Sequence, residues 1–345
     1  MNSTRVGVDL AKKVIQVCVY KNKKVQSNKE LTPEEFTLWL SNSSPCTIVF
    51  EACGTSNYWK QKATESEHDA RIISAKLVKA VRQNQKTDKN DALAIIQAAQ
   101  LPNVEFVSGK SKEQQYLQSI KRMRELAVRQ RDGLKSQLVA LLTELNFRIP
   151  NNEAGIVTTT DNVLEDVENG FSDEFRAALN VAKAQLVMHI DAVKKYDQCL
   201  ESSIEFHPDC KKLLKLEGVG PVNAINLFIA LGCSESGSFR KGKDAAACIG
   251  LPPVQHSSGG KVKLGSIGKH TKDTIMRSQL ITGAMASVQY IAKRPAKTKK
   301  EAWLQGIISR RGKKCAAVAL ANKNVRTAFA MLTQGTEYKA ELLSV

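Results

Sequence analysis

The sequence contains eight cysteines but no Cys-x-x-Cys pair. Its cysteines and five histidines do not form the two ligand pairs that are typical of a structural zinc site. A zinc finger or another structural zinc site is therefore not expected. The cysteines are predicted to be buried free thiols of a reducing compartment, because they are scattered and several lie in apolar runs.

The sequence also lacks long hydrophobic runs. No apolar stretch approaches the roughly 18 residues that a membrane-spanning helix needs, and neither end is obviously amphipathic. The first residues, MNSTRVGVDL, lead directly into a strand-like pattern and not into a signal peptide. We therefore expect a cytoplasmic protein with no membrane partner.

Acidic residues are outnumbered by Lys and Arg, 34 to 51, which gives a formal net charge of +17. The excess is clustered, because nine basic residues and a single acid lie between Lys293 and Lys314. Clustered positive charge favours a polyanion partner, and nucleic acid ahead of an anionic membrane. The 42% hydrophobic fraction and the length of 345 residues predict a folded chain of two or three domains.

The first hundred or so residues mix strand and helix patterns. Short β-branched or apolar runs of strand length are RVGVDL, VIQVCVY, CTIVFEA and ARIISA, and the polar KNKK suits a turn between strands. A helix is predicted to begin with a capping box at Thr32, Pro33 and Glu35, and DALAIIQAAQ has helical composition. This mixture predicts an α/β layer fold with a central sheet.

The middle of the chain predicts a long antiparallel helical coiled-coil hairpin. Its second helix is expected over residues 172–206, after a Gly, Asn and Thr-rich connection at residues 151–161. The seam of the first helix steps by three, four and seven residues through Leu117, Ile120, Met123, Ala127, Leu134, Leu138, Leu141 and Leu145. This seam favours self-association. The basic flank of the first helix fits either nucleic-acid contact or a solvated face.

The third segment contains two glycine-rich features. KLEGVGPVNAINLF places Gly218 and Gly220 between two helical stretches, which is typical of a helix-hairpin-helix turn whose N–H groups bind phosphate, or of a tight helical corner. VQHSSGGKVKLGSIGKH is predicted to be a loop rich in Ser, Gly and Lys. Taken alone, such a loop is more often a solvated turn or a phosphate-binding loop.

Four acidic residues in the first hundred positions lie where a structural role alone does not readily explain them. Asp9 lies inside a strand pattern, where burial of a charge is costly, and Glu51 ends a second strand, where α/β folds place their sites. Asp88 and Asp91 share one face at a helix start, although Asp88 as an N-cap with Asp91 complementing the helix dipole is the alternative. Together the four offer the hard oxygen ligands that two magnesium ions need for phosphodiester chemistry.

GVDLAKK, FEACGTS and KTDKNDA resemble, in order and spacing, the RuvC-like (RNase H-like) DEDD domain of the IS110 family of insertion-sequence transposases, the group related to Piv-type DNA invertases. The resemblance implies a catalytic set with two Mg²⁺ ions held by Asp9, Glu51, Asp88 and Asp91. It also implies that Lys86 and Lys89 hold the phosphates on which the metals act. The expected domains are a RuvC-like domain at residues 1–107, the coiled-coil hairpin at 108–205 and a mainly α-helical transposase domain at 206–345.

LEGVGPVNA, the segment from Phe239 to His270, and RSQLITGAMA resemble the C-terminal transposase domain of the same family, in which a serine before glycine is the nucleophile. The resemblance places that serine at Ser258, with Ser257 left open because the serine is doubled. A serine nucleophile stores the cut bond as a phosphoserine. The cations expected to offset the phosphorane charge are Lys261, Lys263 and Lys269. One hypothesis is that the metals held by the acids activate this serine.

Membership of this family further implies that a structured bridge RNA, encoded by the element, guides recognition of DNA, and that the protein acts as a dimer or tetramer. The basic residues expected to contact RNA or DNA in the tail are Arg310, Arg311, Lys313 and Lys314. A solubilising tail is the alternative.

The sequence therefore predicts a transposase or recombinase that cuts and rejoins DNA through a phosphoserine. One alternative is a metal-only RuvC-type nuclease, such as a junction resolvase, and another is a nucleic-acid-binding protein whose acids are structural. An actin-like kinase also begins with a strand ending in Asp, but it needs Gly and Thr soon after. Here Leu10, Ala11 and Lys12 follow Asp9, which disfavours that class.

Overall fold

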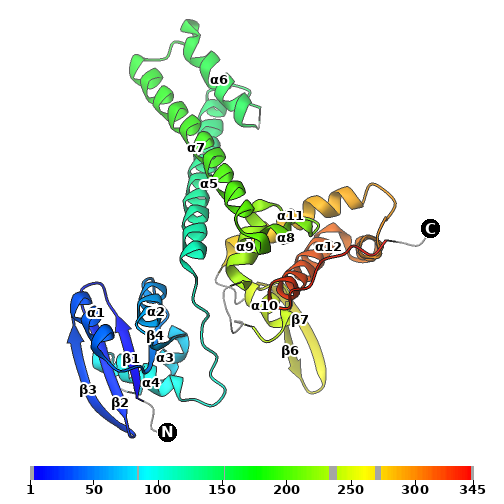
Figure 1. Ribbon diagram of the computed structural model, residues 1–345. Coiled ribbons are helices and arrows are strands. Elements are labelled where there is room, and N and C mark those ends of the chain that lie inside the picture. The colour runs from blue at the N-terminus through cyan, green and yellow to red at the C-terminus, as the bar shows by residue number, and fades with distance from the viewer. Residues whose placement is uncertain (1–3, 84, 151, 233–238, 269–272, 343–345) are drawn as a thin grey trace. The chain divides into compact units, whose positions relative to one another are not determined.

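The computed structural model describes residues 4–83, 85–150, 152–232, 239–268 and 273–342. Internal contacts divide the chain into two compact units. The first comprises Met1–Gln114 and Ala230–Ala245, and the second Gln115–Ile229 and Ala246–Val345. Figure 1 shows the elements of both units along the chain. None of the described helices is long and apolar enough to cross a membrane. The prediction of buried cysteines is only partly right: Cys18 and Cys210 are buried, but four others are exposed, namely Cys53, Cys199, Cys248 and Cys315.

A five-stranded sheet in the order β3-β2-β1-β4-β5 forms the centre of the first unit (Figure 1). β1 (Arg5–Leu10) pairs antiparallel with β2 (Ile15–Lys21) and parallel with β4 (Thr47–Glu51). β3 (Lys24–Leu31) and β5 (Asp69–Ile73) form the edges. The predicted mixed α/β unit with a central sheet is confirmed.

β3 is the one strand of this sheet that the sequence pattern did not predict. Its residues are mostly exposed and polar, as suits an edge strand, so they lack the apolar run that marked the other four. The predicted KNKK turn is confirmed. Asn22 and Lys23 both adopt positive φ there and join β2 to β3 in a tight hairpin.

Two helices cover one face of this sheet. α1 (Pro33–Asn42) and α2 (Ser56–Glu65) contribute Phe36 and Trp59 to a core with the alternate strand residues Val6, Val8, Ile48 and Phe50. The predicted capping box is present at the start of α1. The Thr32 hydroxyl accepts from the backbone N–H of Glu35, whose carboxylate accepts in return from the N–H of Thr32.

The opposite face packs against α3 (Ala75–Val81) and α4 (Asp88–Ala99). Val49 and Ile73 of the sheet join Ile95 of α4 in a second core. Because side chains alternate along a strand, residues one position away from the first core point to this face. β1 therefore presents Gly7 and Asp9 to α4.

The second unit contains a long helical hairpin formed by α5 (Lys112–Glu144) and α7 (Asp173–Glu205) (Figure 1). Its core joins the two helices through Leu138, Leu142, Leu179 and Leu186. The seam prediction was partly wrong. Three residues of the predicted seam, Met123, Leu141 and Leu145, are 40–46% exposed. Leu142, which the prediction omitted, is fully buried.

The predicted connection at residues 151–161 is wrong, because a helix, α6 (Glu153–Glu165), lies there. Asn152 caps it by accepting from the N–H of Gly155. Ile156, Thr160 and Val163 are buried against the hairpin at helical spacing. The Gly and Thr content concealed this pattern. A short 3₁₀ turn, η1 (Val167–Asn169), leads from α6 towards α7.

The rest of the second unit is mainly helical, as predicted. The elements after the hairpin are α8 (Pro208–Lys212), the 3₁₀ turn η2 (Leu213–Lys215), α9 (Pro221–Leu231), α10 (Gly242–Ile249), α11 (Thr274–Ile291) and α12 (Lys299–Thr333). The predicted Ser/Gly/Lys loop is instead a β-hairpin of β6 (Pro253–Ser258) and β7 (Lys261–Ile267). A Gly-Gly pair flanked by alternating residues is a hairpin signal that explains this difference.

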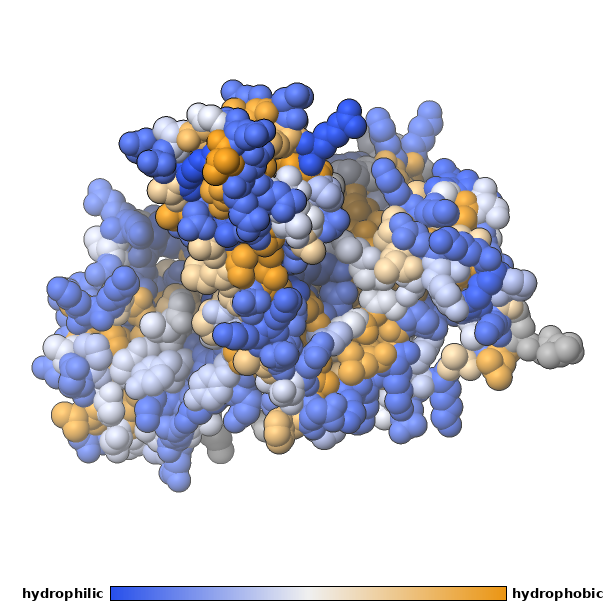
Figure 2. Space-filling view, turned by 90° about the horizontal axis from the view of Figure 1, so that it is seen from above, coloured by the Kyte–Doolittle hydropathy of each residue, from blue (hydrophilic) through white to orange (hydrophobic). Residues whose placement is uncertain are grey.

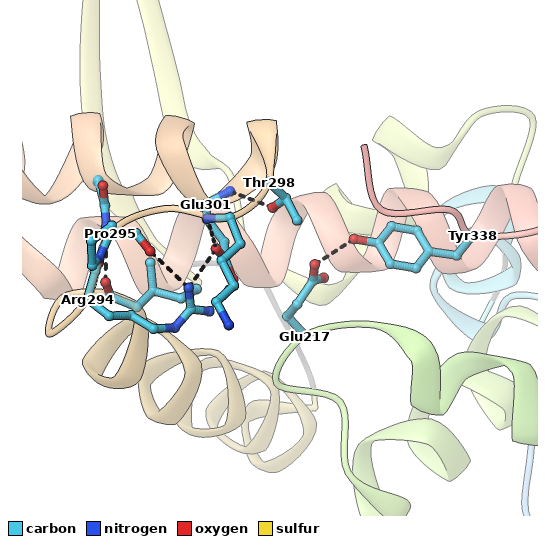
Figure 3. A network of polar contacts seen from close by, with 9 residues as sticks. Glu217, Arg294, Pro295, Thr298, Glu301 and Tyr338 are labelled. Carbon is cyan, nitrogen blue, oxygen red and sulfur yellow. Dashed lines mark hydrogen bonds and ion pairs between the residues drawn. The ribbon is translucent and has the colours of Figure 1, made fainter. Parts of the chain in front are cut away.

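Polar contacts tie the loop before α9 to α12 and to the C-terminal segment. The Glu217 carboxylate accepts from the Tyr338 hydroxyl at 2.7 Å and from Lys300 Nζ at 2.6 Å, as the Tyr338 contact in Figure 3 shows. Glu301 sits beside this set at the start of α12 and receives a two-pronged contact from Arg294. These groups are partly to largely buried, so the network fixes the loop that carries Gly218 and Gly220.

Candidate functional site

The close approach of α4 to β1 positions the acidic residues. A Cβ added at Gly7 would lie 2.2 Å from the Ala92 carbonyl oxygen and 2.7 Å from Ile96 Cγ1. Only glycine allows the helix to lie this close to the strand. Asp9 is two residues beyond Gly7 on the same face of the sheet, so the start of α4 is brought against it.

Three of the four predicted acids converge at this point. Asp9, Asp88 and Asp91 each offer a carboxylate oxygen, and these oxygens all lie within 4.8 Å of one another. Asp91 is buried, Asp9 is partly exposed and Asp88 is exposed. Glu51 ends β4 on the same face of the sheet but does not belong to this group of three. The arrangement has an open side at Asp88 and a buried side at Asp91.

The helix cap at the start of α4 is Thr87 and not Asp88. The Thr87 hydroxyl accepts from the N–H of Asn90, and its carbonyl oxygen accepts from the N–H of Asp91. The interpretation of Asp88 as an N-cap is therefore wrong. Asp88 and Asp91 lie within the first turn, where the helix dipole favours negative charge.

The close approach of the carboxylates makes their negative charges unfavourable in the folded chain. Burial raises the pKa of Asp9 above its usual range, and the negative charges of Asp91 and Asp88 raise it further. Burial likewise raises the pKa of Glu51, and the negative charges of Asp9 and Asp91 raise it further. The Lys86 charge opposes both shifts. A bound cation would relieve this repulsion more directly than protons do.

Arg82, which the sequence gave no reason to select, is part of the site. Its Nη1 lies 2.7 Å from Asp91 Oδ1, and the two side chains are only 21% and 9% exposed. The Arg82 charge also lowers the pKa of Glu51. It thus neutralises part of the acidic set and fixes one oxygen of Asp91. Arg82 follows α3 in a stretch of mixed polar residues, so no pattern distinguishes it.

These donors fit a divalent cation. Carboxylate oxygens are the ligands that Mg²⁺ and similar hard cations take. The three convergent oxygens come from a strand and a helix that the Gly7 contact holds together. Lys86 and Lys89, the lysines beside the two aspartates, are exposed at the start of α4, where a phosphate can reach them.

The predicted nucleophile lies in the second unit. Ser258 is the last residue of β6 and is exposed, and Gly259 and Gly260 follow it with φ of 55° and 76° as the hairpin turn. Ser258 pairs with Lys261 across the ribbon, and Ser257 with Val262. Because Ser257 and Ser258 are adjacent in a strand, they face opposite sides of the ribbon. Lys263 is exposed on β7, and Lys269 lies outside the described residues.

The other predicted nucleic-acid contacts are spread over the second unit. Gly218 has a φ of 79°, and a Cβ there would lie 2.6 Å from the Gly283 carbonyl oxygen, so close packing on α11 requires this glycine. Gly220 is exposed immediately before α9. The basic tail lies within α12 on both sides of Gly312, whose φ of 80° breaks the helix, and its exposed members are Arg310, Arg311, Lys313 and Lys314.

Two family models match the sequence. Residues 6–147 match a model described as a transposase, of the DEDD type named for IS110. Residues 210–299 match a model described as the transposase IS116/IS110/IS902 family. The first match contains the four acids, and the second contains Gly218, Gly220 and the serine hairpin.

Curated relatives match nearly the whole chain. A probable family 20 transposase of Pseudomonas aeruginosa is 33% identical over 98% of this chain and 99% of its own length. The transposase for insertion sequence element IS1111A of Coxiella burnetii is 30% identical over 97% of this chain and 91% of its own. A pilin gene-inverting protein of Moraxella bovis is 24% identical over 87% of this chain and 91% of its own.

Proposed function

The chain belongs to the IS116/IS110/IS902 family of transposases, and on this premise we propose that it cuts and rejoins DNA to move an insertion-sequence element. The observation that carries the proposal is the convergence of the Asp9, Asp88 and Asp91 carboxylates at the exposed start of α4. A basic chain attracts the DNA phosphates, and the acids supply the negative charge that holds cations against them.

The first unit is proposed to be a RuvC-like, RNase H-like catalytic domain. The mixed five-stranded sheet and the acids at the β1 and β4 ends support this assignment. Asp9, Asp88 and Asp91, with Glu51 beside them, would hold two Mg²⁺ ions. Bound there, the ions would polarise the phosphodiester and stabilise the charge that develops on cleavage.

Ser258 is the proposed nucleophile. Its Oγ attacks the phosphorus and gives up its proton, a new Ser258 O–P bond forms, and the bond to one DNA oxygen breaks. That oxygen leaves with the electron pair and takes a proton. A hydroxyl end of another strand then attacks the same phosphorus and releases Ser258, so the strand is rejoined without ATP. Lys261 and Lys263, exposed on the same hairpin, would offset the phosphorane charge.

We assign nucleic-acid contacts to the exposed cations and the glycine loop. Lys86, Lys89 and the basic segment around Gly312 suit backbone binding, because backbone contacts need charge and no fixed base geometry. The Gly218–Gly220 loop is a proposed phosphate contact at the start of α9. A structured bridge RNA encoded by the element would read the DNA sequence by base pairing while the protein holds its backbone.

The proposed active form is a dimer or tetramer assembled through the helical hairpin. α5 and α7 leave large apolar side chains exposed, including Met123, Leu126, Val181 and Met188. The face in Figure 2 is mainly hydrophilic, with groups of hydrophobic residues between the polar ones. Apolar side chains on a mostly polar surface favour burial against another copy.

The test is a strand-transfer assay with the purified full chain, Mg²⁺, RNA from the native locus and labelled element-junction and target DNA. We expect a protein–DNA adduct on denaturing gels that disappears in Ser258→Ala and in Asp88→Ala. Ser257→Ala is the matched control, because it removes the neighbouring hydroxyl from the opposite side of the ribbon and leaves Ser258 in place. An adduct retained in Ser258→Ala and lost in Ser257→Ala would move the nucleophile by one residue.

A metal-only nuclease is the second candidate. It is favoured by the position of Ser258 beside a regular Gly-Gly turn at the exposed end of a hairpin, which a purely structural serine also suits. Free cut ends without an adduct, together with full cleavage by Ser258→Ala, would establish this alternative. Loss of cleavage in Asp88→Ala is expected under both mechanisms. Full activity of Asp88→Ala would contradict both.

A further inference from the structure

Gln16 is a buried polar residue beside the carboxylate site. It pairs with Asp9 in the register of β2 against β1, so the two side chains lie on the same face of the sheet. Directly opposite residues have Cβ atoms about 4.5–5.5 Å apart. Gln16 is only 2% exposed, although it is an uncharged polar residue in an otherwise apolar part of β2. Its polar atoms therefore need partners inside the protein.

A chain of hydrogen bonds fixes the orientation of the Gln16 amide. The Lys89 carbonyl oxygen can only accept, so Asn28 must direct its Nδ2 at it, at 3.0 Å. This leaves Asn28 Oδ1 as the atom that faces Gln16, and Gln16 must donate to it through Nε2, at 2.7 Å. The amide oxygen of Gln16, Oε1, is consequently the atom left over.

Gln16 Oε1 is buried and has no hydrogen-bond partner among the described residues. An unpaired buried acceptor is costly, so the site calls for a donor. The burial of Gln16 excludes a nucleic acid as that donor, because only a small group can reach the atom. The neighbouring carboxylate of Asp9 cannot donate while it is ionised, as it is when it holds a cation. A water molecule can, and a water that hydrates a cation is a strong donor with no competing acceptor role.

We propose that Gln16 is a positioning residue of the carboxylate site, whose Oε1 accepts a hydrogen bond from a water that hydrates the divalent cation held beside Asp9. The Asn28 contact keeps the amide from rotating, so the oxygen stays directed away from Asn28. Gln16 would thereby orient a hydrating water without touching the cation. This inference rests on the proposed function, because it requires a cation at the acids.

The test measures cation binding and not activity. Mn²⁺ is titrated calorimetrically into the full chain at neutral pH, for the wild type, Asp9→Asn, Gln16→Met and Asn28→Ala. Gln16→Met keeps the length of the side chain and removes the acceptor, and we expect it to weaken Mn²⁺ binding about tenfold. Asn28→Ala breaks the same hydrogen-bond chain but leaves Gln16 Oε1, so it is expected to weaken binding by less than about threefold, clearly less than the loss of the acceptor.

Gln16→Glu is the second variant, and it guards against a folding defect in Gln16→Met. It keeps an acceptor oxygen while opposing Asn28 Oδ1, so binding at least as tight as in the wild type is expected. Wild-type binding of Gln16→Met would overturn the inference, as would equal losses in Gln16→Met and Asn28→Ala. If Asp9→Asn does not weaken Mn²⁺ binding, the cation site itself is refuted, which is a separate failure.

Discussion

Replacing Asp9 with asparagine should stabilise the protein in the absence of metal. Asp9, Asp88 and Asp91 bring three carboxylate oxygens within 4.8 Å of one another, and burial together with these neighbours raises the pKa of Asp9. Both observations mean that the ionised Asp9 is less favourable in the folded chain than in water. Asparagine keeps the shape of the side chain and removes the charge. The repulsion should therefore disappear while the packing of β1 against α4 is retained.

The size of the effect follows from the distance. Two unit charges 4.8 Å apart repel by about 3.5 kcal/mol at an effective dielectric constant of about 20. The ion pair between Arg82 and Asp91 cancels part of this repulsion, and solvent around the partly exposed Asp9 screens the rest. We expect the free energy of unfolding to rise by about 1–2 kcal/mol, which is about 3–6 °C in the midpoint for a unit of this size.

The assay is thermal unfolding of the full chain in EDTA, followed by tryptophan fluorescence, because Trp39 and Trp59 lie in the first unit. Glu67→Gln is the matched control. It removes one exposed acidic charge from the same unit, and a surface change of this kind shifts stability by less than about 0.5 kcal/mol. With Mn²⁺ added, the order should reverse, because the wild type gains binding energy that Asp9→Asn cannot.

The pH dependence has a defined sign. The pKa of Asp9 is raised in the folded chain, so the wild type loses stability as pH rises from the unfolded pKa to the folded pKa. The advantage of Asp9→Asn should therefore be full above the raised pKa and disappear in acid. A loss of stability in Asp9→Asn at neutral pH in EDTA, or an equal gain at all pH values, would refute the reasoning.

Three further changes test the packing and the charges. Gly7→Ala should displace α4, because the new Cβ meets the backbone of that helix. We expect the free energy of unfolding to fall by about 1–3 kcal/mol. Metal-dependent cleavage, measured on gels, should be lost as well. Lys300→Met should cost about 3 kcal/mol in urea unfolding, since it leaves the carboxylate of Glu217 partly buried without its cation. Burial would raise the pKa of Glu217, but hydrogen bonds from Lys300 and Tyr338 outweigh it and lower that pKa, so the wild-type advantage should vanish as pH falls through the lowered value. The last change neutralises the four basic residues of the tail, Arg310, Arg311, Lys313 and Lys314. In filter binding, the slope of log binding constant against log salt concentration for DNA or RNA should become shallower by up to about four units. An unchanged slope would identify the tail as a solubilising segment.

The sequence predicted the elements whose signals are local. The four apolar strands and the capping box at Thr32 depend on periodicity and on residues within one turn, and they are present. The missed β3 and α6 have weak local signals. β3 is a polar edge strand held by pairing with β2, and α6 is set by burial of Ile156 and Val163 against the hairpin. Tertiary packing overrode composition in both cases.

The residues of the candidate site also differ in whether a local sequence pattern could predict them. Asp9, Asp88 and Asp91 could be selected because their spacing and positions form a pattern, and the sheet and α4 bring them together. Arg82 and Gln16 could not, because each matters through contacts with residues distant in sequence or across strands. Gln16 left one trace, a polar residue inside an apolar strand. That trace becomes meaningful only when the β1–β2 register places it opposite Asp9.

The start of α4 explains how a strongly basic chain can hold several carboxylates together. Thr87 is the N-cap of α4, so the carboxylates of Asp88 and Asp91 are not needed for capping. Both still lie in the first turn, where the helix dipole favours negative charge. Arg82 neutralises the buried side of the set, and Lys86 opposes the shifts from the exposed side. The helix dipole and the charges of Arg82 and Lys86 together reduce the repulsion among the carboxylates. They do not abolish it, since the pKa values of Asp9 and Glu51 remain raised. The remaining unfavourable charge is what a divalent cation would relieve, so the folded chain is poised to bind one beside the exposed side chains of Lys86 and Lys89.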